Sequence, residues 1–434
     1  MQVTPAAGAP GSPTVRQLLL LSIPALVIGV ASAVVLWLVD LLAEQLHTVL
    51  WEALPGVFGA DAATPWWILV VLTATGAAVG LVVQFAPGHA GVDSATTELD
   101  APPMPILVVP GLLVAVTLSL AGGVSLGPEN PIIAINTALA VTVLARLTKA
   151  VPQQLVVLLA VSATIGALFG TPVAAALVLT GTVAAVKAGG ALWDKLFLPL
   201  AAAGAGAVTM HLLGGSSISF SVTPMGEVEP VFVLTGLVIA AASALAGVLA
   251  AWLLPIVHRA FHSLRHPLLY TTLGGLALGV LGMIGGPMTL FKGLEQTGEL
   301  IEHPERYAPA QLALFAGIKI IALVIAAAAG FRGGRIFPAV FIGVALGLLG
   351  YALIPGVPMS LAIACGALGI VLAATKDGWI AIFVGVALVG DPLVLPLLCV
   401  IVLPVWLIVT KAPELVVHPR ERSDPDAEAA PAAS

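Results

Sequence analysis

Residues 122–131 read GGVSLGPENP and lead directly into the apolar run IIAINTALAVTVLARL (132–147). The glycines and prolines oppose a helix before this run, whereas Pro131 suits a first helical turn, where no N–H is missed. The sequence therefore predicts an unwound turn and then a helix whose first N–H groups lack intrahelical partners. At membrane depth such groups are tolerated only where protein or a watery cavity satisfies them. A helix N-terminus carries about half a positive charge, so we expect an anion there.

The same pattern returns in the second half of the chain. GPENP (127–131) is a G-x-x-x-P sequence, and an offset of 207 residues leads to GRIFP (334–338), which again opens an apolar helix. The offset also places the glycine of HAGVD (89–93) onto the glycine of QTGEL (296–300). We infer two homologous halves whose helix N-termini converge on one anion site at the membrane midplane.

Composition restricts the class of protein. Of 434 residues, 59% are hydrophobic and 9% are charged, and the mean hydropathy is +1.11, whereas a soluble domain carries about 25% charged residues. A water-soluble enzyme is excluded, and a net charge of −6 without a basic stripe excludes a nucleic-acid binder. Runs such as 17–39 and 231–256 are apolar on every face, unlike the alternating strands of a membrane barrel. The predicted fold class is an all-α polytopic membrane protein.

Several apolar segments are too short to cross a bilayer of about 30 Å at about 1.5 Å per residue. The clearest cases are 105–121, 154–169, 359–374 and 378–390, each with glycine or proline at or next to at least one end. Short segments of this kind in both halves of a chain indicate an inverted-repeat transporter with broken helices at its binding site.

These patterns divide the chain into five predicted regions. Residues 1–15 and 416–434 are rich in proline and alanine and are expected to form disordered tails. Residues 16–217 form the first membrane repeat, 218–228 a polar linker, and 229–415 the second repeat.

The N-terminal apolar segment resembles a secretory signal peptide. It continues through residues 34–42, which is too long for the apolar region of a signal, so we interpret it as an uncleaved membrane helix. Basic residues accumulate on the cytoplasmic side of membrane proteins, and those near the predicted ends are Arg16, Arg259, Arg265, Arg420 and Arg422. We therefore expect a multi-pass protein of the inner cell membrane with both termini in the cytoplasm.

Glu129 opens a helix deep within apolar sequence, where ionisable side chains are costly and usually functional. One interpretation is a structural carboxylate that satisfies the helix N-terminus. The other is a tethered surrogate for the anion, which leaves the site when it is protonated so that an anion can enter. Burial favours proton uptake by the carboxylate, whereas nearby N–H donors oppose it. This balance would suit proton-linked gating.

These motifs together resemble the CLC family of chloride channels and proton/chloride antiporters. GPENP resembles the family signature G-[KR]-E-G-P and places Glu129 at the gating glutamate. Residues 314–343 resemble the stretch that ends in G-G-[IV]-F-A-P, 163–179 the helix with F-N-A-P, and 87–99 the G-S-G-I-P region. The resemblance covers nearly the whole membrane portion in the family's order. It implies a CLC fold, transport of a small anion with chloride as the default, and a homodimer with one pathway per subunit.

Several family positions differ in this chain. The serine that holds the central anion falls on Ala90 when the segments are aligned on Gly91, and alanine offers no hydroxyl. The coordinating tyrosine is absent from KAPEL (411–415). Within the signature, the basic residue becomes Pro128 and the next glycine becomes Asn130.

The second half supplies the remaining positions that the resemblance implies. The anion-facing amides map onto Arg335 and Ile336, and the internal proton-transfer glutamate of the antiporters maps onto Thr182. The chain therefore resembles a divergent branch, nearest to bacterial ion-transport members. Glu129 and Thr182 are the candidates for gating and proton transfer. The candidate anion-binding residues are Ala90, Gly91, Gly127, Pro128, Glu129, Asn130, Gly334, Arg335, Ile336 and Phe337.

Other charged residues lie within or beside apolar runs. Lys319 can snorkel or pair with a helix C-terminus, or it can add positive potential to the pathway. Arg335 can attract anions in place of the missing hydroxyl, or it can pair with an acid such as Asp377. Asp391 is expected to cap or break a helix.

Three histidines recur on one predicted helical face, His258, His262 and His266. Two histidines at this spacing can bind zinc. No H-E-x-x-H motif or neighbouring carboxylate accompanies them in the sequence, so we interpret them as part of a basic cytoplasmic loop and predict no metal site.

Two classes of function remain. The first is an anion transporter or channel, coupled to protons or passive; the missing internal glutamate favours a channel, whereas Thr182 and water could carry protons. The second is a polytopic membrane enzyme, which needs clustered catalytic groups. The one acidic cluster near a glycine turn is Asp93, Glu98 and Asp100, without metal-ligand spacing. We predict transport, with an anion, protons and the lipid bilayer as partners and no cofactor; chloride, nitrate, fluoride and small carboxylates all fit.

Overall fold

The computed structural model describes residues 15–97, 103–147, 151–185, 192–215 and 218–418. Over these ranges the regular structure is helical, apart from one isolated β-bridge. The helices of the first half are α1 (Val15–His47), α2 (Leu54–Val57), α3 (Pro65–Phe85), α4 (Val109–Ala121), α5 (Glu129–Leu147), α6 (Gln153–Phe169), α7 (Pro172–Ala185) and α8 (Leu192–Leu212). Those of the second half are α9 (Val231–His262), α10 (Pro267–Gly285), α11 (Leu294–Glu302), α12 (Pro309–Ala328), α13 (Ile336–Leu353), α14 (Met359–Thr375), α15 (Gly378–Val389) and α16 (Val394–Val409).

Eight helices of the described chain are long and apolar enough to cross a membrane, namely α1, α3, α5, α8, α9, α10, α12 and α13. The first of these runs on through a π-helical turn as far as Val57, so the N-terminal apolar segment is one long helix. The predicted short segments are also confirmed, since α4, α6, α14 and α15 are apolar helices of at most 17 residues. The outer sides of α1 and α9 expose large apolar residues such as Leu19 and Trp252, as a lipid-facing surface requires.

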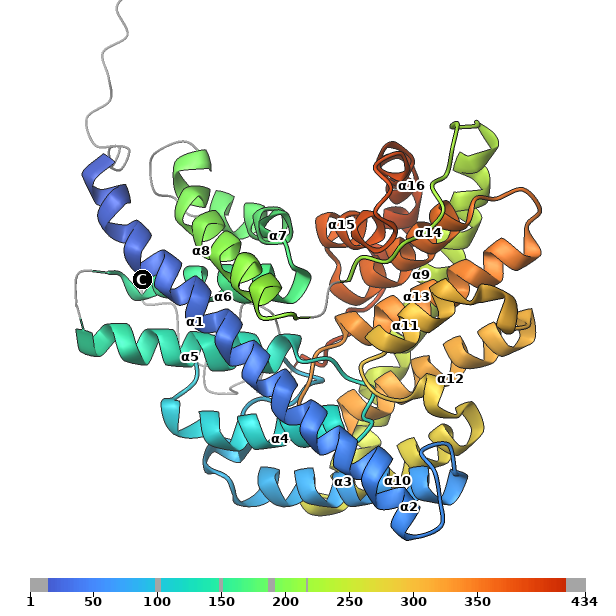
Figure 1. Ribbon diagram of the computed structural model, residues 1–434, viewed down its shortest axis with the longest axis horizontal. Coiled ribbons are helices and arrows are strands. Elements are labelled where there is room, and N and C mark those ends of the chain that lie inside the picture. The colour runs from blue at the N-terminus through green and yellow to red at the C-terminus, as the bar shows by residue number, and fades with distance from the viewer. Residues whose placement is uncertain (1–14, 98–102, 148–150, 186–191, 216–217, 419–434) are drawn as a thin grey trace, which may run out of the picture.

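The two halves repeat one packing arrangement. α1 contacts α4, α6 and α8, and α9 contacts α12, α14 and α16 in the same order. In Figure 1, α4 to α8 of the first half lie on the left and α11 to α16 of the second half lie on the right, while α1 crosses the view from the upper left to the lower right. α3 and α10 hold equivalent places and pack directly against each other. Their backbones approach closely at Gly76 and Gly275, as small residues allow in membrane helix pairs. The chain thus has the predicted all-α fold of two repeats, while the boundaries of the repeats, the linker and the tails stay predictions.

One sequence correspondence is wrong at the level of structure. Gly91 follows a short 3₁₀ turn with a φ of +84°, whereas Gly298 lies inside α11. Gly298 is small because the ring of Phe220 leaves no room for a larger side chain. Glycine is therefore needed at positions 91 and 298 for different physical reasons. The structural correspondence at an offset of 207 residues does not include this pair.

Candidate functional site

The two glycine turns meet in the interior as an antiparallel pair. Gly127 N donates to Gly334 O at 2.8 Å, and Gly334 N donates to Gly127 O at 2.6 Å. This is the only β-bridge in the part of the chain that the structure describes. Glu129 and Ile336 begin α5 and α13 directly beyond it. The two helix N-termini converge, as the sequence predicts.

The Glu129 side chain lies against this glycine pair. It is completely buried, and its Oε1 accepts a hydrogen bond from Phe337 N at 2.8 Å, in the first turn of α13. A Cβ atom at either Gly127 or Gly334 would overlap Glu129 Oε2. A carboxylate of the first half therefore occupies the positive end of a helix from the second half, and glycine is needed at both turns to admit it.

The second oxygen of Glu129 is not satisfied in the same way. Oε2 is buried and has no hydrogen-bond partner within the described residues. Lys292 and Arg335 are cations that interact with the carboxyl group electrostatically. A buried carboxylate with one oxygen unpaired costs free energy. Such a cost is expected of a side chain that can leave its place, whereas a structural cap is expected to have both oxygens paired.

Neighbouring residues of the two turns are also buried. These are Pro128, Asn130 and Ile336, and the Phe337 ring stacks on Phe169 from the end of α6 with 6.3 Å between centroids. Phe169 in turn contacts Phe383 of α15 edge to face. Aromatic side chains of α6, α13 and α15 thus pack together beside the site.

Ala90 and Gly91 lie in the loop that faces the second glycine turn. The link runs through Arg332, which precedes that turn and donates to the carbonyls of Ala90 at 3.1 Å and His89 at 2.8 Å. Ala90 is buried with a φ of +55°. It contributes a backbone carbonyl to Arg332, and its methyl group offers no hydrogen bond.

The hydroxyl that the sequence prediction missed belongs to Ser94, in the same loop. Ser94 Oγ accepts from Gly333 N at 2.8 Å and donates to Phe331 O, and the residue is buried. The signal in the sequence was a serine three positions beyond Gly91. A sequence alignment that rests on Gly91 alone could not find this serine, because its contact joins residues 239 positions apart.

A cavity of about 60 Å³ lies beside this serine. Its polar lining comes from Ser94, Thr97, Asn130, Thr137 and Arg332, and its walls are apolar. Thr137 Oγ1 is buried without a hydrogen-bond partner in the described chain. A few convergent polar groups in apolar walls are typical of a small-ligand site.

A larger cavity of about 230 Å³ lies between α1 and the segment after Phe291. Asp40, Glu44, Lys292 and Glu295 line it, and Lys292 is 3.6 Å from Asp40. Lys292 also interacts electrostatically with the carboxyl group of Glu129 beside the glycine pair.

The structure gives contacts for Arg335, Asp377 and Asp391, while the role of Arg335 towards an anion stays a prediction. Arg335 donates to Leu415 O and to Thr97 O, and Asp377 caps α15 by accepting from two of its first N–H groups. Asp391 lies in the turn between α15 and α16, where it accepts from Leu393 N and from Met225 N.

Lys319 is completely buried. Its Nζ donates to three consecutive carbonyls, those of Thr289, Leu290 and Phe291, at 2.6–3.1 Å. It therefore pairs with the last carbonyl of a 3₁₀ turn (Pro287–Thr289) and with the two carbonyls that follow, while a contribution of its charge to the pathway stays a prediction. Thr182 lies in α7, but its side chain is outside the described part of the structure, so its predicted role stays a prediction.

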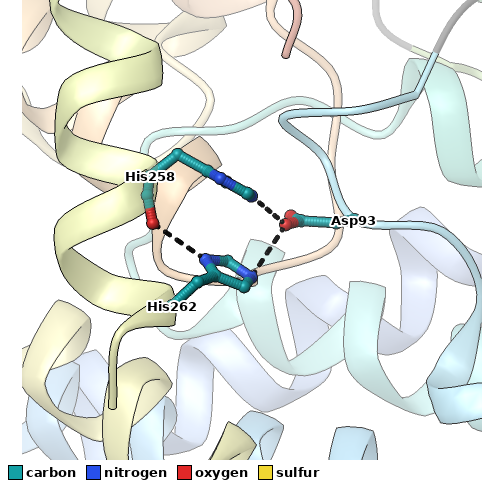
Figure 2. A group of neighbouring side chains, drawn as sticks. All are labelled: Asp93, His258 and His262. Carbon is teal, nitrogen blue, oxygen red and sulfur yellow. Dashed lines mark hydrogen bonds and ion pairs between the residues drawn. The ribbon is translucent and has the colours of Figure 1, made fainter. Parts of the chain in front are cut away.

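The interpretation of the histidines needs a correction. A carboxylate does accompany them, since Asp93 contacts both His258 and His262 (Figure 2). It comes from a loop 165 positions earlier, which explains why local spacing did not reveal it. Burial raises the pKa of Asp93, but hydrogen bonds with the two histidines and the charge of Arg332 outweigh it and lower the pKa to about 2. His266 lies beyond the end of α9 and is exposed.

Comparison with known families agrees with this geometry. Residues 70–408 match the family model described as voltage gated chloride channel. The chain belongs to the CLC family. Members of this family are transporters or channels, so the membrane-enzyme alternative is rejected.

Relatives and solved structures extend the match over nearly the whole CLC chain. It is 46% identical over 413 residues to a protein of Escherichia fergusonii named "Putative ion-transport protein YfeO", which covers 95% of this chain and 98% of the relative. A relative of the same name from Escherichia coli O1:K1 / APEC shows the same identity and coverage.

Two crystal structures share the fold. A CLC-type fluoride/proton antiporter has a TM-score of 0.75 at 20% identity and covers 93% of this chain and 98% of its own. A slow cyanobacterial Cl⁻/H⁺ antiporter has a TM-score of 0.76 at 19% identity, with coverages of 90% and 94%. At these identities the likeness concerns the fold.

Proposed function

We propose that this CLC protein moves a small inorganic anion, with chloride as the default, and that the Glu129 carboxylate gates the pathway. The observation that carries the proposal is the hydrogen bond from Phe337 N to Glu129 Oε1, beside Gly127 and Gly334. It puts a negatively charged group of the chain itself at the place where the two turns and a helix N-terminus favour an anion.

The gating step follows from the charge of this group. An ionised carboxylate accepts a charge-assisted hydrogen bond, which is roughly twice as strong as a neutral one. Protonation of Glu129 removes that advantage and its attraction to the α13 N-terminus, so the side chain can leave. The anion then takes its place at Phe337 N and at the neighbouring amide of Ile336. Because Oε2 starts without a partner, little is lost on that side when the carboxyl group departs.

The cavity beside Ser94 provides one approach to this place. Ser94 holds Gly333 and Phe331 at the edge of this cavity, and Asn130 and Thr137 add polar groups along the wall. Arg332 and Arg335 make the approach positive, which attracts anions. On the other side, the cavity with Lys292 serves as the second vestibule.

Proton coupling and the choice of anion are parts of the same proposal. The two crystallised relatives are titled as fluoride/proton and Cl⁻/H⁺ antiporters, which supports testing both anions with protons. Passive conduction is the second candidate, because the sequence resemblance aligns Thr182 with the internal acid of the antiporters. For protons that cross by exchange, we propose a route through Glu129 with Thr182 and water on the inner side.

The setting of the protein completes the proposal. Arg259 and Arg265 close α9 and the turn after it, and Arg16 lies in the first turn of α1. Positive residues remain on the cytoplasmic side, which supports an inner-membrane protein with both termini in the cytoplasm. We propose a homodimer with one pathway per subunit, as the family resemblance implies.

Anion efflux from liposomes tests the proposal. Purified wild type, Glu129→Gln and the control Glu302→Gln are compared for chloride and fluoride, with and without a proton gradient. Glu302 is an exposed carboxylate at the end of α11. We expect Glu129→Gln to keep anion flux but lose its pH dependence, and the control to match wild type. A Glu129→Gln protein with unchanged pH dependence would refute the gating role.

A further inference from the structure

A group of three potential metal ligands lies outside the anion site. Asp93 Oδ2 is 3.0 Å from His258 Nε2 and 3.3 Å from His262 Nε2. Figure 2 shows both imidazole rings turned from α9 towards the carboxylate, which comes from the loop after Gly91. The first repeat therefore supplies the carboxylate and the second repeat supplies the histidines.

The contacts of His262 leave one of its ring nitrogens, Nε2, without a hydrogen-bond donor. His262 Nδ1 is 3.1 Å from His258 O, and because a carbonyl only accepts, Nδ1 carries the proton. In the neutral ring, Nε2 then has a bare lone pair, and it faces a carboxylate oxygen that also only accepts. Two acceptors at 3.3 Å require a cation between them, either a second proton or a metal ion.

The surroundings of the three ligands match those of metal sites. Metal-bound histidines commonly donate their other N–H to a backbone carbonyl, and ligating carboxylates are themselves hydrogen-bonded. His262 meets the first condition through His258 O, and Asp93 meets the second because Oδ1 accepts from Ala95 N at 3.3 Å. The His262 ring is also held between the rings of His258 and Tyr270, with centroids 3.8 and 4.6 Å away.

The distances suit a transition-metal ion. One ligand atom from each residue lies within 4.8 Å of the other two. Bonds of about 2.0–2.1 Å in a tetrahedral site place neighbouring ligand atoms about 3.3 Å apart, close to the two distances from Asp93. Two imidazoles and one carboxylate suit Zn²⁺ and similar ions. The side chains of His258, His262 and Asp93 remain 14%, 33% and 17% exposed, so an ion can enter and keep a water ligand.

We propose that Asp93, His258 and His262 bind one divalent transition-metal ion of the Zn²⁺ class and thereby fasten the loop of the first repeat to α9 of the second. Ser94, the next residue, is bonded to Gly333 and Phe331 beside the second glycine turn. Occupancy of the metal site thus holds Ser94 in place. Arg332 also acts electrostatically on Asp93, which limits the affinity for a cation.

Metal stoichiometry tests this inference without any transport measurement. The untagged full chain in detergent is stripped with EDTA, dialysed against Zn²⁺ and analysed for bound zinc. The variants are Asp93→Asn, His258→Gln and His262→Gln, with His266→Gln as the matched control from the turn after α9. We expect one zinc per chain in wild type and control. In each ligand variant the affinity should fall by more than the roughly 10–100-fold that a lost outer partner costs.

Cobalt substitution provides a second measurement on the wild-type protein, in case a variant does not fold. Bound Co²⁺ should give the visible absorption of a low-coordinate site with nitrogen and oxygen ligands, and Zn²⁺ should displace it. No zinc above the EDTA-treated background in wild type would overturn the proposal and leave an imidazolium–carboxylate pair only. Folded ligand variants that bind zinc as wild type does would overturn it equally.

Discussion

The first and second glycine turns are equivalent in sequence and bonded to each other, yet each is held in place by the opposite half of the chain. The first turn is fixed by second-half backbone, since Phe291 N donates to Gly123 O at 3.0 Å. Lys319 supports that contact, because its Nζ donates to the carbonyls of residues 289–291. The second turn is fixed by first-half residues, because the Ser94 hydroxyl accepts from Gly333 N and Arg332 donates to the backbone carbonyls of residues 89 and 90.

The comparison also shows where the symmetry ends. Each turn has a buried cation and a bracing contact from the other half, so the scaffold is nearly symmetric. The first turn carries a carboxylate, Glu129, whereas the second presents the N–H of Phe337 that receives it. A symmetric frame thus supports one asymmetric contact, and that contact is where the proposed gating chemistry takes place.

The largest expected effect comes from removing the cation behind the first turn. Lys319→Met leaves three buried carbonyls without their donor, and each such group costs about 1–3 kcal/mol. We expect a loss of more than about 3 kcal/mol of stability, measured as a fall in the unfolding midpoint in detergent. Lys411→Met, at an exposed position, should have almost no effect. Equal midpoints for the two variants would show that Lys319 does not support the first turn.

A smaller effect is expected at the glycine pair. Gly334→Ala places a methyl group where Glu129 Oε2 lies, and overpacking typically costs about 1–3 kcal/mol. The carboxylate must move away, so we expect anion flux that no longer responds to pH, together with a lower unfolding midpoint. The control is Gly317→Ala in α12, where a Cβ meets nothing within 4 Å. Retained pH dependence in Gly334→Ala would contradict the close contact between the glycine and the carboxylate.

The bracing of the second turn should give a smaller effect on stability than Lys319→Met. Ser94→Ala removes one hydroxyl and leaves Gly333 N and Phe331 O without that partner, and each such group costs about 1–3 kcal/mol at most. We expect the flux to require a higher anion concentration for half-maximal rate. Ser263→Ala serves as the control because that hydroxyl binds only its own helix end in the described structure and is exposed. An unchanged concentration dependence would remove Ser94 from the proposed pathway.

The parts of this arrangement that sequence could predict depend on local patterns. Glycine disfavours a helix through its backbone freedom, and proline does so through its fixed φ and missing N–H. GPENP and GRIFP therefore predicted two unwound turns with helices after them. The apolar length of segments such as 359–374 predicted helices too short to cross the bilayer. Glu129 was conspicuous because a carboxylate is expensive within apolar sequence.

The rest could not be predicted because it depends on contacts between distant segments. Ser94 reaches Gly333, and Asp93 reaches His258, across more than a hundred residues. Lys319 was visible as a buried cation, but its three carbonyl partners were not. Residues 91 and 298 show the opposite error, because the sequence suggested a correspondence that the structure does not have. Gly91 lies in a turn with a positive φ, whereas Gly298 lies in a helix against the ring of Phe220.

The claim that the Glu129 carboxylate and the transported anion compete for one place can be tested most directly by crystallography of Glu129→Gln. Crystals soaked in bromide, a heavier probe for chloride, can locate the ion by its anomalous signal. We predict a bromide peak within hydrogen-bond distance of Phe337 N, beside Gly127 and Gly334, with the substituted side chain at position 129 displaced and no such peak in wild type at high pH. A mutant whose introduced amide at position 129 still binds Phe337 N, with bromide only elsewhere, would contradict the account.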